Sequence, residues 1–416
     1  MWVVKTDNIG TMEWDVVFGG DGDDIVSSLL QTSDEGIIVA GYSNSPSTNR
    51  QDLYLVKLNN DGDIVWHHEY TGDENKSVRK IVSTTDGDVI LGGSTTSKQS
   101  TTSDLFLQKV TEFGEIEWMQ RYNIGKTDYL TDFLETADNG FILSGMTSIK
   151  FNIHSETDLI GFIAKTDFSG NLVWKYTFDT FPNFYYNTSG SVIHSLAQAG
   201  NFVYVFGELL PHSIDWCEYT ECLHHATFLL KIDLNGNLIF NNPSYVRCAP
   251  YNWLYYDDFI DMVLSPSGEI LIVGNGNRFR DPTLWITNEL NSKLGEFHIN
   301  GTYNYSKPVF KAITSDNNGH FIVAGETNTR SINGLSRDVL LLEISDNGEL
   351  GWFSIIGESG FFESNGRMEL IHFPTSNPSS SSSIPFLNLS FINLLILVLI
   401  RKKLPFIVSF HRRKWI

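Results

Sequence analysis

One pattern, Lys-x-Asp/Asn-x-x-Gly-x-x-x-Trp, recurs along the chain and constrains its fold more than any other feature. Copies run from Lys5 to Trp14, from Lys57 to Trp66, from Lys109 to Trp118, from Lys165 to Trp174 and, with phenylalanine at the end, from Lys231 to Phe240. Degenerate copies end at Phe297 and Trp352, so the closing aromatic residues lie 52, 52, 56, 66, 57 and 55 residues apart. Repeats of this length are typical of propeller blades and other repeat arrays.

Each repeat contains four short apolar or alternating runs bounded by turn residues, which predicts four β-strands. In the first full repeat these runs are residues 25–31, 37–42, 53–58 and 64–69. Six full repeats begin near Ile25, Val78, Tyr129, Ser191, Phe259 and Val309. We therefore expect an all-β fold over residues 1–373, a β-propeller of four-stranded antiparallel blades.

The two ends of the repeat array hold strands without a complete repeat, at residues 2–6, 12–18 and 367–373. Joined, these N- and C-terminal strands would make a seventh blade, and closing the propeller would remove its exposed sheet edges. Met1 stands where the third strands of other repeats have Asp52, Asp104 or Asp338. We therefore expect an upstream part that holds a signal peptide and further strands.

The residues that define the repeat have a mechanical explanation. The Asp-x-x-Gly segment predicts a tight turn between strands three and four, with glycine at positive φ and the aromatic residue packed between blades. Each second strand has a glycine that allows close backbone approach: Gly41, Gly93, Gly145, Gly207, Gly274 and Gly325. Asp24, Asp128 and Asp257 recur eight residues before Thr32, Thr136 and Ser265. We interpret them as structural, because an active site seldom repeats with its scaffold.

Composition excludes several classes of protein. Mean hydropathy is −0.12, which argues against both a disordered chain and a polytopic membrane protein. The last 33 of the 416 residues hold six Lys/Arg and no acidic residue, so residues 1–383 carry 23 basic and 49 acidic side chains, a net charge of −26. Such a surface repels phosphate backbones, and we expect no nucleic-acid partner.

The units resemble the β-propeller repeats of bacterial and archaeal cell-surface proteins. In the second repeat the resemblance rests on Thr84, Asp86, Gly87, Gly93, Lys109, Gly114 and Trp118. It implies the fold and says little about activity. The Asp-x-x-Gly-x-x-x-Trp turn is also similar to the blade motif of pyrroloquinoline-quinone dehydrogenases. Their adjacent-cysteine ring and cofactor-binding pattern are not apparent in this sequence.

Two classes of connection vary in length, those between strands two and three and those between successive repeats. In antiparallel blades both emerge at the same end, and the long ones belong to repeats three to five. They carry the candidate ligand-binding residues Tyr185, Tyr186, Trp216, Tyr219, Trp253, Tyr255 and Tyr256. Such rings either stack on a glycan, a peptide or a surface protein, or pack among themselves within the loops.

We expect a non-enzymatic binding module with no catalytic residues, because the common nucleophile, zinc-protease, phosphate-loop and dinucleotide motifs are missing. One alternative is an extracellular enzyme, a glycan hydrolase or a quinone-dependent dehydrogenase with calcium. Its candidate carboxylates are Glu208, Asp215, Asp257 and Asp258. A structural envelope component is the other alternative.

The insertion in the fourth repeat contains Cys217 and Cys222, and Cys248 follows in the next connection. We expect a Cys217–Cys222 disulfide in an oxidising compartment. With His212, His224 and His225, the same insertion also has enough donors for tetrahedral zinc, although the spacing lacks the usual paired knuckles. We expect no resident cofactor.

The C-terminal region predicts a membrane anchor. Residues 374–383 form a Ser/Pro-rich linker, and residues 384–400 are 17 residues without a charge, followed by Arg401, Lys402 and Lys403. The positive-inside rule makes residues 401–416 a cytoplasmic tail and directs the propeller outward, as a monomeric single-pass protein of the cell membrane. Possible glycan acceptors are Asn75, Asn187, Asn300 and Asn304. The alternative for residues 384–400 is a buried strand pair.

Overall fold

A computed structural model describes most of the repeat array. The described residues are 1–6, 12–19, 24–45, 50–97, 102–148, 159–178, 188–211, 226–244, 258–266, 268–275, 283–287, 293–300, 309–315, 320–331, 334–345, 350–356 and 369–372. The chain divides into two compact units, the first with Met1–Lys5 and Trp14–Pro250 among its residues and the second with Tyr251–Phe406. Each unit is described by itself.

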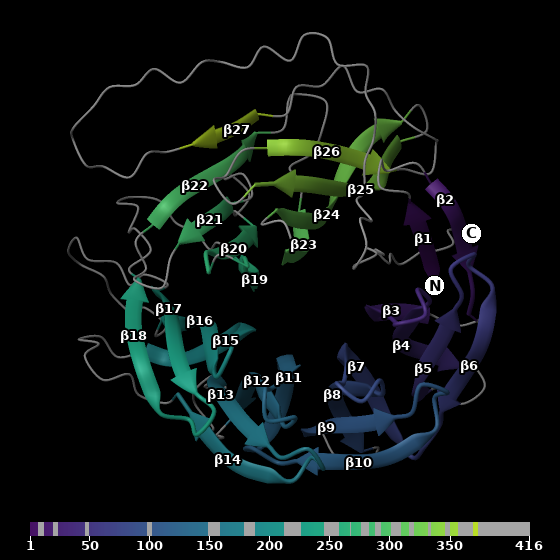
Figure 1. The fold of residues 1–416 in the computed structure, drawn as a ribbon, viewed down its shortest axis with the longest axis horizontal. Coiled ribbons are helices and arrows are strands. Elements are labelled where there is room, and N and C mark those ends of the chain that lie inside the picture. Colours follow the sequence, from purple (N-terminus) through teal and green to yellow (C-terminus); the bar gives the residue numbers. More distant parts are fainter. Residues whose placement is uncertain are drawn as a thin grey trace. The chain divides into compact units, whose positions relative to one another are not determined.

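The first unit holds four four-stranded antiparallel sheets, each built from consecutive strands. The first two are β3 (Asp24–Gln31), β4 (Ile37–Ser45), β5 (Arg50–Leu58), β6 (Ile64–Tyr70) and β7 (Glu74–Ser83), β8 (Val89–Ser97), β9 (Ser103–Val110), β10 (Ile116–Tyr122). The next two are β11 (Thr127–Glu135), β12 (Phe141–Ser148), β13 (Leu159–Thr166), β14 (Leu172–Thr177) and β15 (Thr188–Ala199), β16 (Phe202–Pro211), β17 (Ala226–Asp233), β18 (Leu238–Ser244). In Figure 1 the first strand of each sheet lies innermost and the fourth outermost within this unit.

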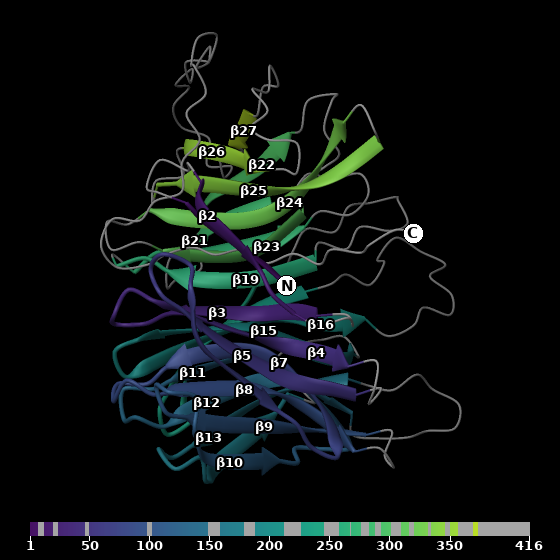
Figure 2. The ribbon, with the colours of Figure 1, turned by 90° about the vertical axis from the view of Figure 1, so that its right-hand side faces the viewer.

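The second unit repeats the same arrangement. Its sheets are β19 (Asp258–Leu264), β20 (Ile270–Asn275), β21 (Thr283–Thr287), β22 (Lys293–Asn300) and β23 (Val309–Ser315), β24 (Phe321–Ser331), β25 (Gly334–Ile344), β26 (Leu350–Ile356). Within each unit the first strands of successive sheets are in contact, for example β3 with β7 and β19 with β23. Figure 2 shows the stacked strands of the first unit from the side. The prediction of an all-β propeller protein with four-stranded antiparallel blades is confirmed.

The strands at the two ends of the array do not pair as expected. β1 (Trp2–Thr6) and β2 (Met12–Val17) form a two-stranded sheet of their own. β27 (Glu369–His372), predicted to be the innermost strand of a closing blade, instead pairs antiparallel with the outer edge of β22. The sequence pattern marked this segment as a strand correctly. The predicted pairing partner of this strand was wrong. An apolar run specifies a strand but does not specify which unpaired sheet edge the strand joins.

Each first strand has a β-bulge opposite the glycine of the second strand. In β11 the register shifts between Leu130 and Asp132, and Leu130 pairs with Gly145. A Cβ at Gly145 would lie 2.0 Å from the carbonyl oxygen of Tyr129, so only glycine fits beside the bulge. The predicted close backbone approach is confirmed here, and the same contact recurs at Gly41, Gly93, Gly207 and Gly325.

The glycine of the three-to-four turn lies under an aromatic ring of the preceding sheet, as predicted. Gly170 has a φ of 76°, and a Cβ there would lie 2.8 Å from the ring of Trp118. The hydroxyl of Tyr122 also donates to the Gly170 carbonyl oxygen at 2.7 Å. In the fifth sheet the register differs from the prediction. Gly295, not Phe297, pairs with the third strand where the other sheets have the closing aromatic residue.

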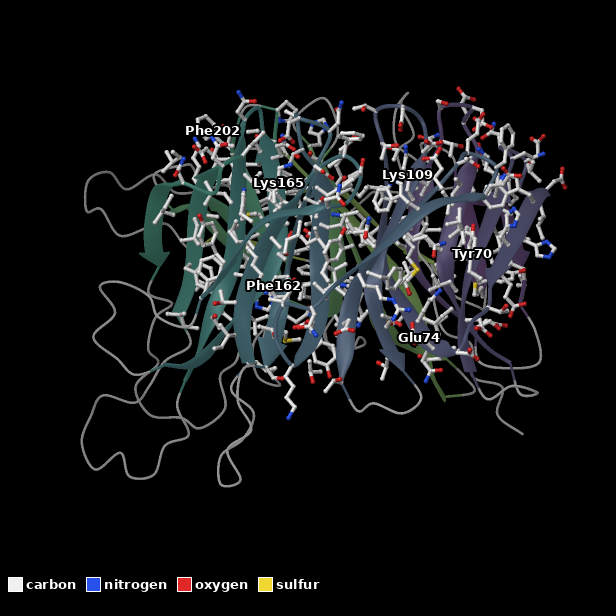
Figure 3. All side chains as sticks on the ribbon, turned by 90° about the horizontal axis from the view of Figure 1, so that it is seen from below. Tyr70, Glu74, Lys109, Phe162, Lys165 and Phe202 are labelled. Atoms are coloured by element: carbon white, nitrogen blue, oxygen red, sulfur yellow. The ribbon has the colours of Figure 1, made fainter. Side chains whose placement is uncertain are left out.

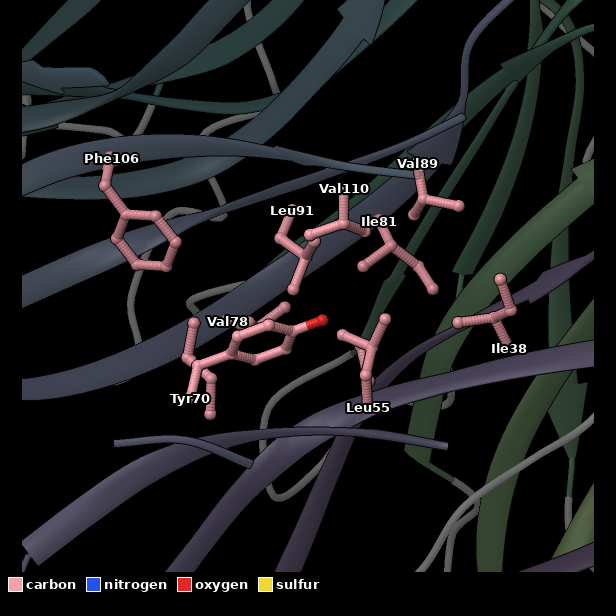
Figure 4. Close-up of a cluster of buried hydrophobic side chains, with 11 residues drawn as sticks. Ile38, Leu55, Tyr70, Val78, Ile81, Val89, Leu91, Phe106 and Val110 are labelled. Carbon is pink, nitrogen blue, oxygen red and sulfur yellow. The ribbon is translucent and has the colours of Figure 1, made fainter. Parts of the chain in front are cut away.

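The core lies between successive sheets. Figure 4 shows the layer between the first and second sheets, in which Leu55 and Tyr70 of one meet Val78, Leu91 and Phe106 of the other. Burial raises the pKa of the Tyr70 hydroxyl, which donates to the Gly114 carbonyl oxygen at 2.6 Å. In the described ranges, no helix is long and apolar enough to span a membrane. The predicted membrane segment, residues 384–400, lies outside them.

Candidate functional site: the long-loop end of the sheets

The lengths of the connections between strands differ between the two ends of each sheet. The one-to-two and three-to-four connections have five residues or fewer in all six sheets. By contrast, 10 residues separate β12 from β13 and β14 from β15, 14 separate β16 from β17, and 13 separate β18 from β19. Because the strands of each sheet are antiparallel, both variable classes emerge at one end, called the long-loop end below, and the short turns lie at the other. The predicted division of connections is confirmed.

The short-turn end is occupied by a repeated ion-pair network. In the first three sheets the lysine of the third strand reaches the Thr-x-Asp turn of its own sheet, as Lys109 Nζ does with Asp86 Oδ2 at 2.7 Å and Asp88 Oδ2 at 2.8 Å. Lys57 bonds Asp34 at 2.8 Å and Lys165 bonds Asp138 at 2.9 Å. Figure 3 shows Lys109 and Lys165 at one end of the strands and Glu74 at the other.

This network explains why the lysine and aspartate recur. The hydrogen bond from Lys109, with a second from Thr84, lowers the pKa of Asp86 to about 2. Burial acts to lower the pKa of Lys109, and hydrogen bonds to its carboxylate partners outweigh burial and raise it. The fourth sheet lacks the Thr-x-Asp turn, and Lys231 Nζ lies 4.7 Å from the centre of the Phe202 ring instead. The repeated polar residues therefore hold turns together.

Asp128, one of the recurring aspartates, also has a structural role. Asp128 is fully buried and accepts hydrogen bonds from the backbone N–H groups of Ile124 at 2.8 Å and Gly125 at 3.0 Å. The Thr147 hydroxyl donates to it at 2.5 Å. These three donors hold the Asp128 carboxylate in place, and the carboxylate closes the connection before β11. Asp257 lies outside the described residues.

The innermost strands are joined by a second carboxylate. Asp132, beside the bulge of β11, accepts from Lys80 Nζ of β7 at 2.6 Å and from the Leu196 N–H of β15 at 2.8 Å. Arg79, the bulged residue of β7, donates to the Thr131 carbonyl oxygen at 2.9 Å. Asp132 thus links three successive sheets, and Lys80 compensates its buried charge.

At the long-loop end, strand termini of the second sheet carry a cluster of charged side chains. Arg121 on β10 forms a two-pronged ion pair with Glu74 on β7, at 2.6 Å for Nη1 to Oε1, and Thr95 donates to Glu74 at 3.0 Å. The hydrogen bond from Arg121 lowers the pKa of Glu74. Burial, followed by the nearby Arg121 charge, lowers the pKa of Lys76. This end therefore presents polar side chains that the repeat does not dictate.

The predicted binding residues belong to the connections at this end and lie outside the described residues. They are Tyr185, Tyr186, Trp216, Tyr219, Trp253, Tyr255 and Tyr256, and the predicted Cys217–Cys222 disulfide falls in the same category. Among the residues that the structure describes, no cluster of three or more His, Cys, Asp or Glu side chains is arranged to hold a metal ion. Asn75, a possible glycan acceptor, lies in β7 and accepts from the Gln51 N–H at 3.3 Å.

Sequence reasoning considered Glu208 and missed the residue beside it. His194 is the bulged residue of β15, and its Nε2 lies 3.5 Å from Oε1 of Glu208 on β16. Both side chains are largely buried. The recurring glycine of the second strands is the signal for this placement, because Gly207 marks where the opposite strand bulges and so which residue loses its regular partner.

No family model matches this sequence, and no curated protein matches it. Among solved structures, the chain is similar to puromycin hydrolase, with a TM-score of 0.48 and 12% identity over 86% of this chain and 50% of that chain. It is also similar to the α-L-arabinofuranosidase Arb93A of Fusarium graminearum, with a TM-score of 0.46 and 12% identity over 77% of this chain and 94% of that chain. For the β-propeller domain of the trilobed protease of Pyrococcus furiosus, the TM-score is 0.42, with 10% identity over 84% and 100% of the two chains. This chain thus spans about half the length of puromycin hydrolase, and similarities this distant carry no argument about activity.

Proposed function

We propose that the chain is a membrane-anchored extracellular β-propeller binding module that recognises a glycan, a peptide or a surface protein through the long connections of repeats three to five. The supporting observation is the contrast between the two ends of the sheets. At the short-turn end the repeated polar side chains are paired with one another, as Lys109 is with Asp86 and Asp88. Between the strands that the structure describes, connections longer than five residues occur only at the other end.

The chemistry of the connections fits recognition by stacking. They carry tyrosine and tryptophan side chains, which offer a flat apolar face and one polar group at low entropic cost. Sugars and extended peptides are bound by such rings. Membrane anchoring is proposed from residues 384–400 and the basic residues that follow them, with the propeller on the outer side.

The test separates binding from folding. Trp216→Ala and Trp253→Ala, made one at a time, are measured for retention on a printed glycan array and a displayed peptide library, together with thermal unfolding. We expect at least one variant to lose retention with little change in unfolding temperature. The control Trp174→Ala removes a scaffold ring whose Nε1 donates to the Leu234 carbonyl oxygen at 3.1 Å, and it should lower the unfolding temperature. Retention unchanged in both loop variants would contradict the proposed site.

One observation favours the enzyme alternative, namely the His194–Glu208 pair. A histidine beside a carboxylate is a usual arrangement for proton transfer, and here the two side chains are 3.5 Å apart without a hydrogen bond between them among the described residues. If the chain hydrolyses glycans with this pair, Glu208→Gln removes turnover on a panel of arabinans and other glycans while leaving ligand retention intact. Wild-type protein with no turnover on that panel argues for the binding module.

A further inference from the structure

Exposed apolar side chains recur at an equivalent position in the four sheets of the first unit, where the outer strand of each sheet begins. They include Ile64 and Val65 on β6, Ile116 on β10, Leu172 and Val173 on β14, and Ile239 on β18. Ile64 is 47% exposed and Val65 is 57% exposed. A single exposed aliphatic residue is ordinary on a protein surface. Exposed aliphatic residues at the same strand position in four sheets need an explanation.

The backbone beside these residues is unpaired on its outer side. β6, β10, β14 and β18 each end their sheet, and among the described residues no strand pairs with their outer edges. An unpaired edge presents N–H and C=O groups that another extended chain satisfies. The fifth sheet shows such strand addition within the chain. Its strand β27 pairs antiparallel with the outer edge of β22, with His298 opposite Ile371 and Ile299 opposite Leu370. A four-residue strand is thus accepted on an outer edge of this architecture.

Charge distinguishes among the possible occupants of these edges. Residues 59–70, which form the turn before β6 and the strand itself, contain Asp61, Asp63 and Glu69 and no Lys or Arg. A second copy of the chain would bring the same carboxylates against this edge, and an anionic lipid surface would be repelled in the same way. An extended segment with aliphatic and basic side chains meets no such penalty.

We propose that the outer edge of β6 is a docking site for an extended segment of a partner protein in which aliphatic and basic side chains combine. The segment adds antiparallel to β6 as a fifth strand. Val65, His67 and Glu69 alternate with Ile64, Trp66 and His68, so they share one face of the sheet. An aliphatic side chain opposite Val65 and a lysine or arginine opposite Glu69 fill that face. This site is separate from the long-loop end.

The probe is a fluorescein-labelled eight-residue peptide with lysine at positions 2 and 4, valine at positions 6 and 8 and threonine elsewhere, titrated against the full chain by fluorescence anisotropy. In an antiparallel strand these positions share one face, so position 6 can lie opposite Val65 and position 2 opposite Glu69. We expect saturable binding that weakens as salt rises, because the carboxylates near β6 are exposed and screened. Val65→Lys should weaken binding about tenfold, since it places a cation beside the incoming lysines. Val173→Lys on β14 is the matched control. Residues 167–177 contain Asp167 and Lys175 in balance, and this variant should leave binding unchanged.

Two altered peptides test the mode of binding. Proline at alternate positions removes the backbone N–H groups of the added strand and should abolish binding. Glutamate in place of lysine should do the same through repulsion. Equal binding of the proline peptide, or no effect of Val65→Lys, would overturn strand addition at β6. Concentration-dependent dimers in sedimentation that Val65→Lys removes would make a second copy the occupant and also overturn the proposal.

Discussion

The side-chain amide of Gln108 is buried in an apolar layer without a hydrogen-bond partner among the described residues, and replacing it should stabilise the protein. Gln108 lies in β9 with no exposed surface, and neither its Oε1 nor its Nε2 has a hydrogen-bond partner among the described residues. It shares a face of the strand with Phe106 and Val110, which pack against the first sheet. At the same register the other sheets have Val56, Ala164, Leu230, Trp285 and Leu342.

The magnitude follows from the cost of an unpaired amide. A buried donor or acceptor without a partner costs about 1–3 kcal/mol, and leucine has nearly the volume of glutamine while adding apolar contact. We therefore expect Gln108→Leu to raise the free energy of unfolding by about 1–3 kcal/mol. Gln108→Glu should act in the opposite direction, because it places an ionisable group in the same layer. Gln120→Leu on the partly exposed face of β10 is the control and should change stability by less than about 0.5 kcal/mol.

The assay is urea unfolding of the full chain at neutral pH, followed by tryptophan fluorescence and by far-UV circular dichroism. Because a repeat array need not unfold in one step, the quantity compared is the midpoint of the transition that contains the first and second sheets, at constant slope. A Leu variant that unfolds at lower urea than wild type would refute the reasoning. It would mean that the amide makes bonds that leucine cannot replace.

Three further predictions rest on the same structure. Gly145→Ala should destabilise the protein by about 2–4 kcal/mol, because its Cβ meets the Tyr129 carbonyl oxygen at 2.0 Å, whereas Gly72→Ala, with no atom within 4 Å, should be tolerated; thermal unfolding that is equal for the two variants would contradict this. The pKa of Asp86 is lowered to about 2 from a usual 3.8, so its ion pair with Lys109 stabilises the fold above about pH 4 and this stabilisation is lost as pH falls towards 2. Acid unfolding of Lys109→Met should lack this pH-dependent loss of stability. A pH midpoint of acid unfolding equal to that of wild type would show that the pair contributes nothing. Asp132→Ala should cost about 2–3 kcal/mol in urea unfolding, because it leaves the Leu196 N–H without its acceptor and Lys80 without its ion pair; Asp132→Asn, which keeps an acceptor for that N–H, should recover part of the loss.

The repeat pattern predicted the sheets because each of its residues acts within one sheet or on its neighbour. Gly170 needs positive φ and space under Trp118, and both requirements recur whenever the turn recurs. Lys109 and Asp86 face each other across a single sheet. Because each requirement acts within one sheet or between neighbouring sheets, the residues concerned recur at a fixed spacing. Such a spacing can be recognised in the sequence alone.

Features that depend on a choice among equivalent partners were not predictable. The strand β27 was expected to start a closing blade and joins β22 instead, because any unpaired edge offers it the same backbone groups. The degenerate pattern predicts Phe297 as a closing aromatic residue, yet the register gives that position to Gly295. The two residues lie close in sequence and the repeat had become too degenerate to separate them. The aromatic residues of the long connections remain predictions, since no spacing constrains them.

Side chains that differ from the repeat pattern are of two kinds, those whose polar atoms are stabilised by neighbours and those with an unsatisfied buried polar atom. Lys231 lies over the Phe202 and Tyr204 rings in the sheet that lacks the Thr-x-Asp turn, so its charge is stabilised there and its position is explained by the scaffold. Gln108 and His194 also differ from their counterparts, and each has a buried nitrogen that makes no hydrogen bond among the described residues. A scaffold gains nothing from an unsatisfied polar atom, so such positions either cost stability or serve a use outside the scaffold. Gln108 lies in an apolar layer and fits the first case, whereas His194 lies at a bulge beside Glu208 and is the candidate for the second case. The Gln108→Leu and Glu208→Gln experiments test the two cases separately, because the first measures stability in urea and the second measures turnover of glycans.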